Sequence, residues 1–214
     1  MTSSKLNQSV LETVTLLEVP TVVTMSVSEQ VFQADESKTS SVTVTVNRGT
    51  AVKDETVEIS ASRTDGVSDA GSVSDVVNNG DGTYSATYTP PKVVGQVSLL
   101  ATAKKSGVTS TSVSITTNAG PAANLVLVLA PEEISSLAQG SITARVTDAA
   151  GNGVGGLELR GTAAGGGSVS VSTAGDAFGS YSLTYTASKV EAVGTDEVTV
   201  SVLTTGISRR LNFQ

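Results

Sequence analysis

The chain has 214 residues, enough for one large domain or two domains of about 100 residues each. It contains no cysteine, no histidine and no tryptophan, only 3% of its residues are aromatic, and its formal net charge is −7. Without cysteine and histidine there is no thiol nucleophile, no Ser-His-Asp triad and no zinc site of the usual kind. The acidic balance argues against nucleic acid or anionic lipid as a partner. The composition therefore predicts a protein that is not an enzyme.

The segment at residues 1–20 belongs to neither of the repeats described below. Val10, Val14 and Leu16 alternate loosely with polar residues, which permits a strand. Three interpretations stay open: a disordered leader, the last strand of a preceding domain, or a donor strand that completes a neighbouring subunit's sheet. Residues 1–9 are polar and lack the basic end, apolar stretch and cleavage site of a secretory signal.

From residue 21 onward, apolar residues recur at every second position, which is the spacing of β-strands. In the first half of the chain these residues are Val42, Val44, Val46, Val57, Ile59, Tyr84, Ala86, Tyr88, Leu99, Ala101, Ala103, Val113 and Ile115. Turn-forming clusters at 47–49 and 78–82 separate the runs. The pattern predicts about seven short strands and no helix.

The alternation stops at residues 116–122, where small residues surround a Gly-Pro pair. We predict a boundary here between two domains, 21–117 and 118–214. A junction this short, with a proline in it, allows some bending but no free tumbling, so we expect an end-to-end rod. The alternation resumes in the second half at Ile142, Ala144, Val146, Val198, Val200 and Val202.

Membrane insertion is not expected for this chain. Its longest clear apolar run is Leu125–Ala130. That run is far shorter than the roughly 18 residues needed to cross a bilayer.

The two halves are copies of one unit. The run Gly82–Thr89 (GTYSATYT) recurs 97 residues later as Gly179–Thr186 (GSYSLTYT), and these two runs hold all four tyrosines. Upstream, Gly-Ser-Val-Ser at 71–74 recurs after 96 residues at 167–170, and Val57-Glu58-Ile59 matches Leu157-Glu158-Leu159 after 100 residues. Landmarks in one order with nearly constant offsets predict two tandem antiparallel sandwiches.

Two glycine patterns imitate nucleotide-binding motifs without their context. Gly151, Gly153 and Gly156 spell G-x-G-x-x-G, but they lie between two predicted strands rather than before a helix, so we interpret them as a hairpin turn. Gly161 and Gly166 have the spacing of a phosphate-binding loop, yet Gly167 stands where the lysine must be.

Oxygen-bearing side chains are interpreted mainly as turn and surface residues. Candidate calcium ligands are Asn79, Asp81, Asp148 and Asn152, but the alternating acidic ligands and closing glutamate of a calcium loop are missing, so these residues are expected to cap turns. Adjacent carboxylates splay apart and are expected to be solvated rather than to form a glycosidase pair; they are Asp35-Glu36, Glu132-Glu133 and Asp196-Glu197.

Two further kinds of site are not expected from the residues present. With the tyrosines assigned to strands, the remaining aromatic residues are Phe32, Phe178 and Phe213, too few for sugar-stacking platforms. Nothing marks Lys38 or Lys53 as the donor of an intramolecular isopeptide bond. We therefore predict no catalytic, no cofactor-binding and no metal-binding residues, and no cofactor.

The residue patterns resemble two families of immunoglobulin-like repeats. The run at 78–90, followed by Gly95 and an apolar strand, resembles the filamin-type repeat. The run at 144–154 (ARVTDAAGNGV), preceded by Ala-Gly-Pro-Ala at 119–122, is similar to the bacterial immunoglobulin-like repeats of the invasin/intimin adhesins. Both resemblances imply an all-β fold of two tandem immunoglobulin-like sandwiches. Tyr84 and Tyr181 are then expected to form tyrosine corners, with the ring buried and the hydroxyl on a backbone carbonyl.

This resemblance is specific for the fold and weak for the function, because such modules serve many proteins. The leading expectation is a non-catalytic structural or adhesive module, a spacer or stalk of an extracellular or cell-surface protein such as an adhesin. The alternatives are a virion decoration or tail-appendage protein, and a filament subunit that assembles through residues 1–20. The expected partners are proteins, either a surface receptor or neighbouring subunits.

Overall fold

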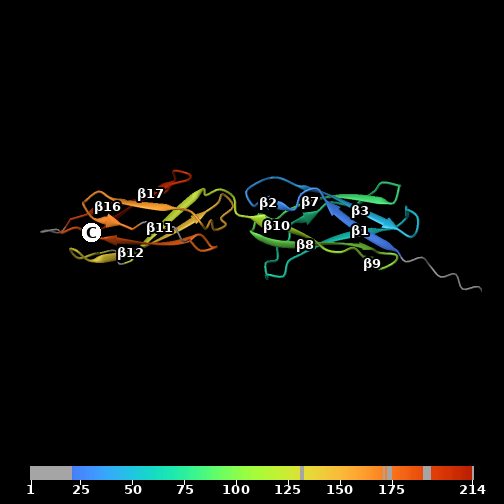
Figure 1. Ribbon diagram of the computed structural model, residues 1–214, viewed down its shortest axis with the longest axis horizontal. Helices are drawn as coiled ribbons and strands as arrows, with labels where there is room; N and C mark the ends of the chain where they lie inside the picture. Colours follow the sequence, from blue (N-terminus) through green and yellow to red (C-terminus); the bar gives the residue numbers. More distant parts are fainter. Residues whose placement is uncertain (1–20, 131–132, 171, 173–174, 190–193, 214) are drawn as a thin grey trace, which may run out of the picture.

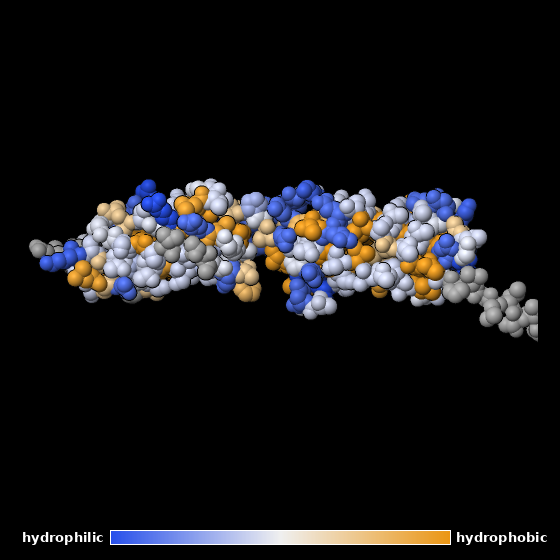
Figure 2. Space-filling model, viewed as in Figure 1, coloured by the Kyte–Doolittle hydropathy of each residue, from blue (hydrophilic) through white to orange (hydrophobic). Residues whose placement is uncertain are grey.

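The computed structural model describes residues 21–130, 133–170, 172, 175–189 and 194–213. They form two β-sandwiches that lie end to end in an elongated molecule (Figure 1). Every regular element among the described residues is a β-strand, so the all-β prediction is confirmed. That part of the chain contains no helix long and apolar enough to cross a membrane. Hydrophilic and hydrophobic residues are interspersed along the visible face of both domains (Figure 2).

The first sandwich is built from two five-stranded sheets. One sheet has the order β1-β3-β7-β5, with β6 also paired to β7, and the other has the order β2-β10-β8-β4, with β9 also paired to β8. The pairing of β2 with β10 is parallel, and the other pairs are antiparallel. The strands are β1 (Val22–Val27), β2 (Val31–Gln33), β3 (Ser40–Asn47), β4 (Val57–Ser62), β5 (Ser72–Val73), β6 (Val77–Asn78), β7 (Thr83–Thr89), β8 (Gly95–Ala103), β9 (Val108–Thr109) and β10 (Val113–Asn118).

The second sandwich packs a sheet of order β11-β12-β15-β14 on a sheet of order β13-β16-β17, with all pairs antiparallel. The strands are β11 (Asn124–Ala130), β12 (Gln139–Thr147), β13 (Leu159–Ala163), β14 (Ser168–Val169), β15 (Ser180–Thr186), β16 (Asp196–Val202) and β17 (Ser208–Phe213). The first sandwich exceeds the expected seven strands because it includes two-residue strands that pair too briefly to leave a periodic pattern.

Each core is formed by the alternate residues that the sequence pattern marked. In β3 every second residue is buried, from Ser40 to Val46, and the same alternation runs along β12 from Gly140 to Val146. Burial of the valine, isoleucine and alanine side chains at these positions between two sheets is the main favourable term in folding. Alternation therefore both selects the strands and decides which face of each sheet points inward.

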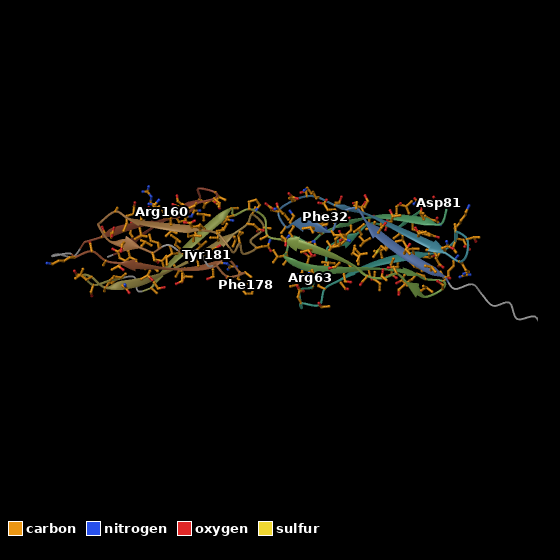
Figure 3. All side chains as sticks on the ribbon, in the orientation of Figure 1. Phe32, Arg63, Asp81, Arg160, Phe178 and Tyr181 are labelled. Atoms are coloured by element: carbon orange, nitrogen blue, oxygen red, sulfur yellow. The ribbon has the colours of Figure 1, made fainter. Side chains whose placement is uncertain are left out.

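The tyrosine corners are confirmed in both sandwiches. The ring of Tyr84 is 1% exposed, its hydroxyl donates to the carbonyl oxygen of Val52 at 3.0 Å, and it accepts from the peptide N–H of Glu55 at 3.0 Å. Tyr181, also 1% exposed, donates to the carbonyl of Val154 at 2.8 Å and accepts from the N–H of Leu157 at 3.0 Å (Figure 3).

The second tyrosine of each pair corrects one interpretation of the sequence. Tyr88 donates to the carbonyl of Ala70 at 2.8 Å, whereas Tyr185 donates to the Oδ2 atom of Asp196 at 2.6 Å. Asp196 is therefore not a solvated surface carboxylate as predicted, because it anchors a buried ring. Burial raises the pKa of Tyr88 to about 12. Burial, together with the hydrogen bond to Asp196, raises the pKa of Tyr185 to about 12.

The tyrosine hydroxyls also correct the alignment of the two copies. Because Tyr84 bonds Val52 and Tyr181 bonds Val154, the equivalent loops are 102 residues apart. The strands that follow then match Val57 with Leu159, and both of these side chains face inward. The offset of 100 suggested by Val57-Glu58-Ile59 and Leu157-Glu158-Leu159 is therefore wrong by two residues. A shift of two residues along a strand leaves the same face pointing inward, so the alternating pattern of the sequence does not reveal the error.

Replacing Tyr84 by phenylalanine should destabilise the first domain by about 1–3 kcal/mol, because the part-buried carbonyl of Val52 and the buried N–H of Glu55 lose their partner. Urea unfolding of the purified chain measures this change. Thr87→Ala, at an exposed position of the same strand, is the control and should cost much less. A Tyr84→Phe protein as stable as the original would show that the hydroxyl is dispensable.

Candidate functional site

The junction between the two sandwiches brings together polar groups from both domains. Residues 119–123 link β10 to β11, and the turn at 148–152 follows β12 at the end of the second sandwich that faces the first. The loop at 92–94, between β7 and β8, approaches this turn from the first sandwich. We take these three segments as the candidate functional site, because they determine how the two domains are held.

Asp148 organises the linker and the turn from a fully buried position, with 0% of the residue exposed. Its Oδ2 atom accepts a hydrogen bond from the N–H of Gly120 in the linker at 2.9 Å. Its Oδ1 atom accepts from the N–H groups of Ala150 and Asn152 at 2.9 and 2.8 Å. The Asn152 side-chain amide donates to both oxygens, at 3.0 and 3.2 Å. The buried charge is thus compensated by donors from two segments.

Asn152 carries the direct contact between the domains. Its Nδ2 atom donates to the carbonyl oxygen of Lys92 at 2.9 Å, and its Oδ1 atom accepts from the N–H of Val94 at 3.2 Å. The side-chain amide therefore pairs with the backbone of the first sandwich as a neighbouring strand would. Asp148 holds the same amide from behind, so its orientation is determined before it meets the first domain.

The loop that receives Asn152 is supported from within the first domain. The Arg63 side chain is 1% exposed, and its Nη2 atom donates to the carbonyl of Val94 at 2.8 Å. The same guanidinium forms an ion pair with Asp65, and its hydrogen bond lowers the pKa of that carboxyl to about 2. Figure 3 shows Arg63 and Phe178 near the two ends that face each other. Arg63 and Asp65 were not singled out in the sequence, since neither belongs to a repeat or motif.

A close backbone approach completes the junction and corrects a second surface assignment. A Cβ atom on Gly120 would lie 2.1 Å from Oδ1 of Asp35, so only glycine leaves room for that carboxylate. The Oδ1 atom of Asp35 is buried and has no hydrogen-bond partner among the described residues. Asp35 is therefore packed at the junction rather than solvated as predicted, whereas its neighbour Glu36 forms a surface ion pair with Lys38 at 2.9 Å.

The candidate calcium ligands fall into two separate groups. Asn79 and Asp81 lie in the β6–β7 turn, where Oδ1 of Asp81 accepts from the N–H and hydroxyl of Thr83 at 2.9 and 2.6 Å. Asp148 and Asn152 lie at the junction and bind one another. Their roles as turn-capping residues are confirmed by these bonds. Among the described residues, no three or more acidic side chains come together as a metal site.

The remaining sequence candidates have structural roles. Gly151 lies in the junction turn with a φ of 90°, and a Cβ on Gly153 would collide with the backbone of Phe178, so the turn interpretation of this glycine run is confirmed. A Cβ on Gly161 would collide with Val169 instead of facing a ligand. The backbone carbonyl of Lys53 accepts from Asn78 at 2.7 Å.

The other carboxylates and aromatic residues are dispersed. Glu197 pairs with Arg210 at 3.2 Å, Glu133 is exposed, and Glu132 lies outside the described residues. Of the phenylalanines, Phe32 is 2% exposed in the first core and Phe178 is 77% exposed beside the junction.

Asn152→Ala should widen the range of angles between the two domains, because it removes both hydrogen bonds to the loop at 92–94. Small-angle X-ray scattering, combined with residual dipolar couplings for each domain, measures this change. Asn124→Ala is the matched control: it removes an amide that donates to the backbone carbonyl of Asp148 at 3.2 Å, a hydrogen bond within the second domain. Equal interdomain order in the two variants would contradict this role of Asn152.

Acid should loosen the same junction. Burial alone would raise the pKa of Asp148, but hydrogen bonds from Gly120, Asn152 and Ala150 outweigh it and lower the pKa below its ordinary value. A carboxyl group whose pKa is lower in the folded than in the unfolded state stabilises the folded state at pH values above its unfolded-state pKa of about 3.9. This stabilisation is lost as the pH falls through the folded-state pKa. As the pH falls below about 3.9 and then through the lower folded-state pKa of Asp148, the domains should lose mutual order, as read from dipolar couplings. Asp148→Asn should abolish the acid-dependent part of this change.

Several solved structures of bacterial proteins are similar to this chain. Invasin, a bacterial integrin-binding protein, is 17% identical, with a TM-score of 0.62 over 90% of this chain and 40% of its own. InvD of Yersinia pseudotuberculosis is 21% identical, with a TM-score of 0.60 over 90% of this chain and 57% of its own. FdeC, an Escherichia coli adhesin, is 22% identical, with a TM-score of 0.53 over 90% of this chain and 63% of its own.

These similarities concern the fold and cover only part of each larger structure. No protein-family model matches the chain, and no curated protein is similar to it in sequence. The filamin-type similarity of the first repeat stays a prediction. The two sandwiches, the tyrosine corners and the end-to-end arrangement give the chain the fold of tandem bacterial immunoglobulin-like domains of the invasin/intimin type.

Proposed function

We propose that this chain is a non-catalytic spacer within an extracellular, adhesin-type surface protein, where it holds a binding region away from the cell. The observation that carries the proposal is the bonded junction: Asn152 ties the second sandwich to the backbone of the first, and Asp148 ties the linker to the same turn. A spacer has to resist bending, and this junction supplies that resistance.

The fold supports the same assignment. Bacterial adhesins with solved structures contain the same tandem sandwiches, although this chain spans 63% or less of the structures compared above. Fold alone does not determine function, so the physical argument rests on the junction. A receptor or a neighbouring subunit remains the proposed kind of partner.

The polar side chains described above form hydrogen bonds that stabilise the fold and the junction. Tyr84 and Tyr181 serve the strand corners, Asp148 and Asn152 serve the junction, and Asp196 holds Tyr185. This use of the polar side chains favours a mechanical role over a catalytic one.

The two alternatives remain predictions from the sequence. A virion protein and a filament subunit both depend on residues 1–20, which lie outside the described residues. Scattering from dilute protein, with and without residues 1–20, separates them from the spacer. An elongated monomer in both samples supports the spacer, whereas oligomers that vanish on truncation favour an assembling subunit.

The spacer function predicts a dependence on stiffness when the chain is displayed on a bacterium between an outer-membrane anchor and a small binding domain. Cells carrying residues 21–214 should adhere to ligand-coated beads better than cells carrying a Gly/Ser linker of equal residue number, because the bonded junction holds the binding domain at a fixed distance from the cell, whereas a flexible chain lets that distance fluctuate. Equal surface amounts of the binding domain, measured by flow cytometry, are the control. Equal adhesion of the two strains would overturn the proposal.

A further inference from the structure

Strand β11 has an open edge. It is the terminal strand of the sheet β11-β12-β15-β14 and pairs only with β12 among the described residues; β17 of the other sheet lies beside it without pairing to it. In such a strand, every second residue directs its N–H and C=O away from the sheet. An open row of donors and acceptors is a template for another strand, and natural proteins usually guard it with charge, proline or a bulge.

The guarding residues are missing from β11. The strand reads Asn-Leu-Val-Leu-Val-Leu-Ala, with no charge and no proline, and it pairs with β12 in continuous register over all seven residues. Its outward side chains Val126 and Val128 are 58% and 60% exposed. Their neighbours on β12 are Arg145 and Thr143, which leave both valines open to solvent.

The first domain shows that the fold does not require these valines. Val23 in β1 and Leu125 in β11 are equivalent, since both are buried and pair with the equivalent residues Val46 and Val146. The outward positions that correspond to Val126 and Val128 are therefore Thr24 and Ser26. One copy of the repeat has polar residues on this edge where the other has valine.

We propose that β11 is a self-association edge that pairs antiparallel with β11 of a second copy of this chain. A two-fold axis that passes midway between the two Leu127 residues places Val126 of each copy opposite Val128 of the other. An axis centred between the two Val126 or the two Val128 residues would instead set a valine opposite Asn124 or Ala130. The pairing centred on Leu127 thus covers all four exposed valines, and cross-strand pairs of β-branched residues favour it.

Electrostatics and symmetry are compatible with this occupant. The strand has no charge, so the two copies do not repel each other along the new contact, and each Arg145 is separated from the opposite copy by its own β11. A two-fold contact is closed and yields a dimer rather than a fibre. Two seven-residue strands bury less area than a standard interface of about 1,600 Å², so the dimer is weak and depends on concentration.

Sedimentation velocity of the full chain over a range of concentrations tests the proposal. The unaltered protein should show a reversible monomer–dimer equilibrium, and Val126→Thr with Val128→Ser should weaken it about tenfold or more, because less apolar surface is covered. Val22→Thr, at a 53% exposed valine of β1, is the matched control and should leave dimerisation unchanged. A protein that stays monomeric at high concentration overturns the proposal, as does a dimer that persists in the double variant.

Disulfide trapping tests the pairing itself, since the chain contains no cysteine of its own. A mixture of Val126→Cys and Val128→Cys chains should cross-link on mild oxidation several-fold faster than either variant alone. Equal rates would contradict the axis at Leu127. Deleting residues 1–20 should leave the cross-link intact; its loss would assign the association to that segment instead. None of these outcomes depends on the spacer function.

Discussion

The carboxylate of Asp148 is the group on which the arrangement of the whole molecule depends. It is fully buried, yet it accepts hydrogen bonds from the linker at Gly120, from two peptide groups of its own turn and from the Asn152 amide. Charge-assisted bonds of this kind are strong, and removing the acceptor leaves several donors without a partner. Because Asn152 also meets the loop at 92–94, a single acidic residue shapes the turn, directs the linker and orients one sandwich on the other.

The duplicated frame uses the same positions for different purposes. Strand β12 of the second sandwich is followed by Asp148, and the equivalent strand β3 of the first sandwich is followed by Arg48. The Nε atom of Arg48 donates to the hydroxyl of Thr21 at 3.0 Å. Likewise, outward Thr24 and Ser26 correspond to Val126 and Val128. The inward-facing residues of the two copies are similar because both sets must fill a similar core, whereas the residues at edges and turns can differ without disturbing that core.

Sequence-based expectations succeeded or failed according to the range of the interaction involved. The tyrosine corners were predictable because ring, turn and strand lie in one recurring run, and the structure places both hydroxyls on backbone groups as expected. Asp35 and Asp196 were assigned to solvent because each is followed by a second carboxylate, and adjacent carboxylates on loops or edges are expected to splay apart into water. In the structure, Asp35 packs against Gly120 and Asp196 accepts a hydrogen bond from Tyr185. The partner residues belong to other segments of the chain, which only the fold brings close.

The amino-acid sequence by itself determined that the protein is all-β, that it contains two copies of one sandwich, and which side chains face each core. These properties follow from alternation and repetition, which are visible among neighbouring residues. Only the tertiary structure decided how the domains meet, which carboxylates are buried and which edge stays open. The bonds that join the sandwiches connect residues 58 and 60 positions apart. These hydrogen bonds form only when the loops at 92–94 and 148–152 lie side by side, and the periodic pattern of the sequence does not predict the conformation of loops.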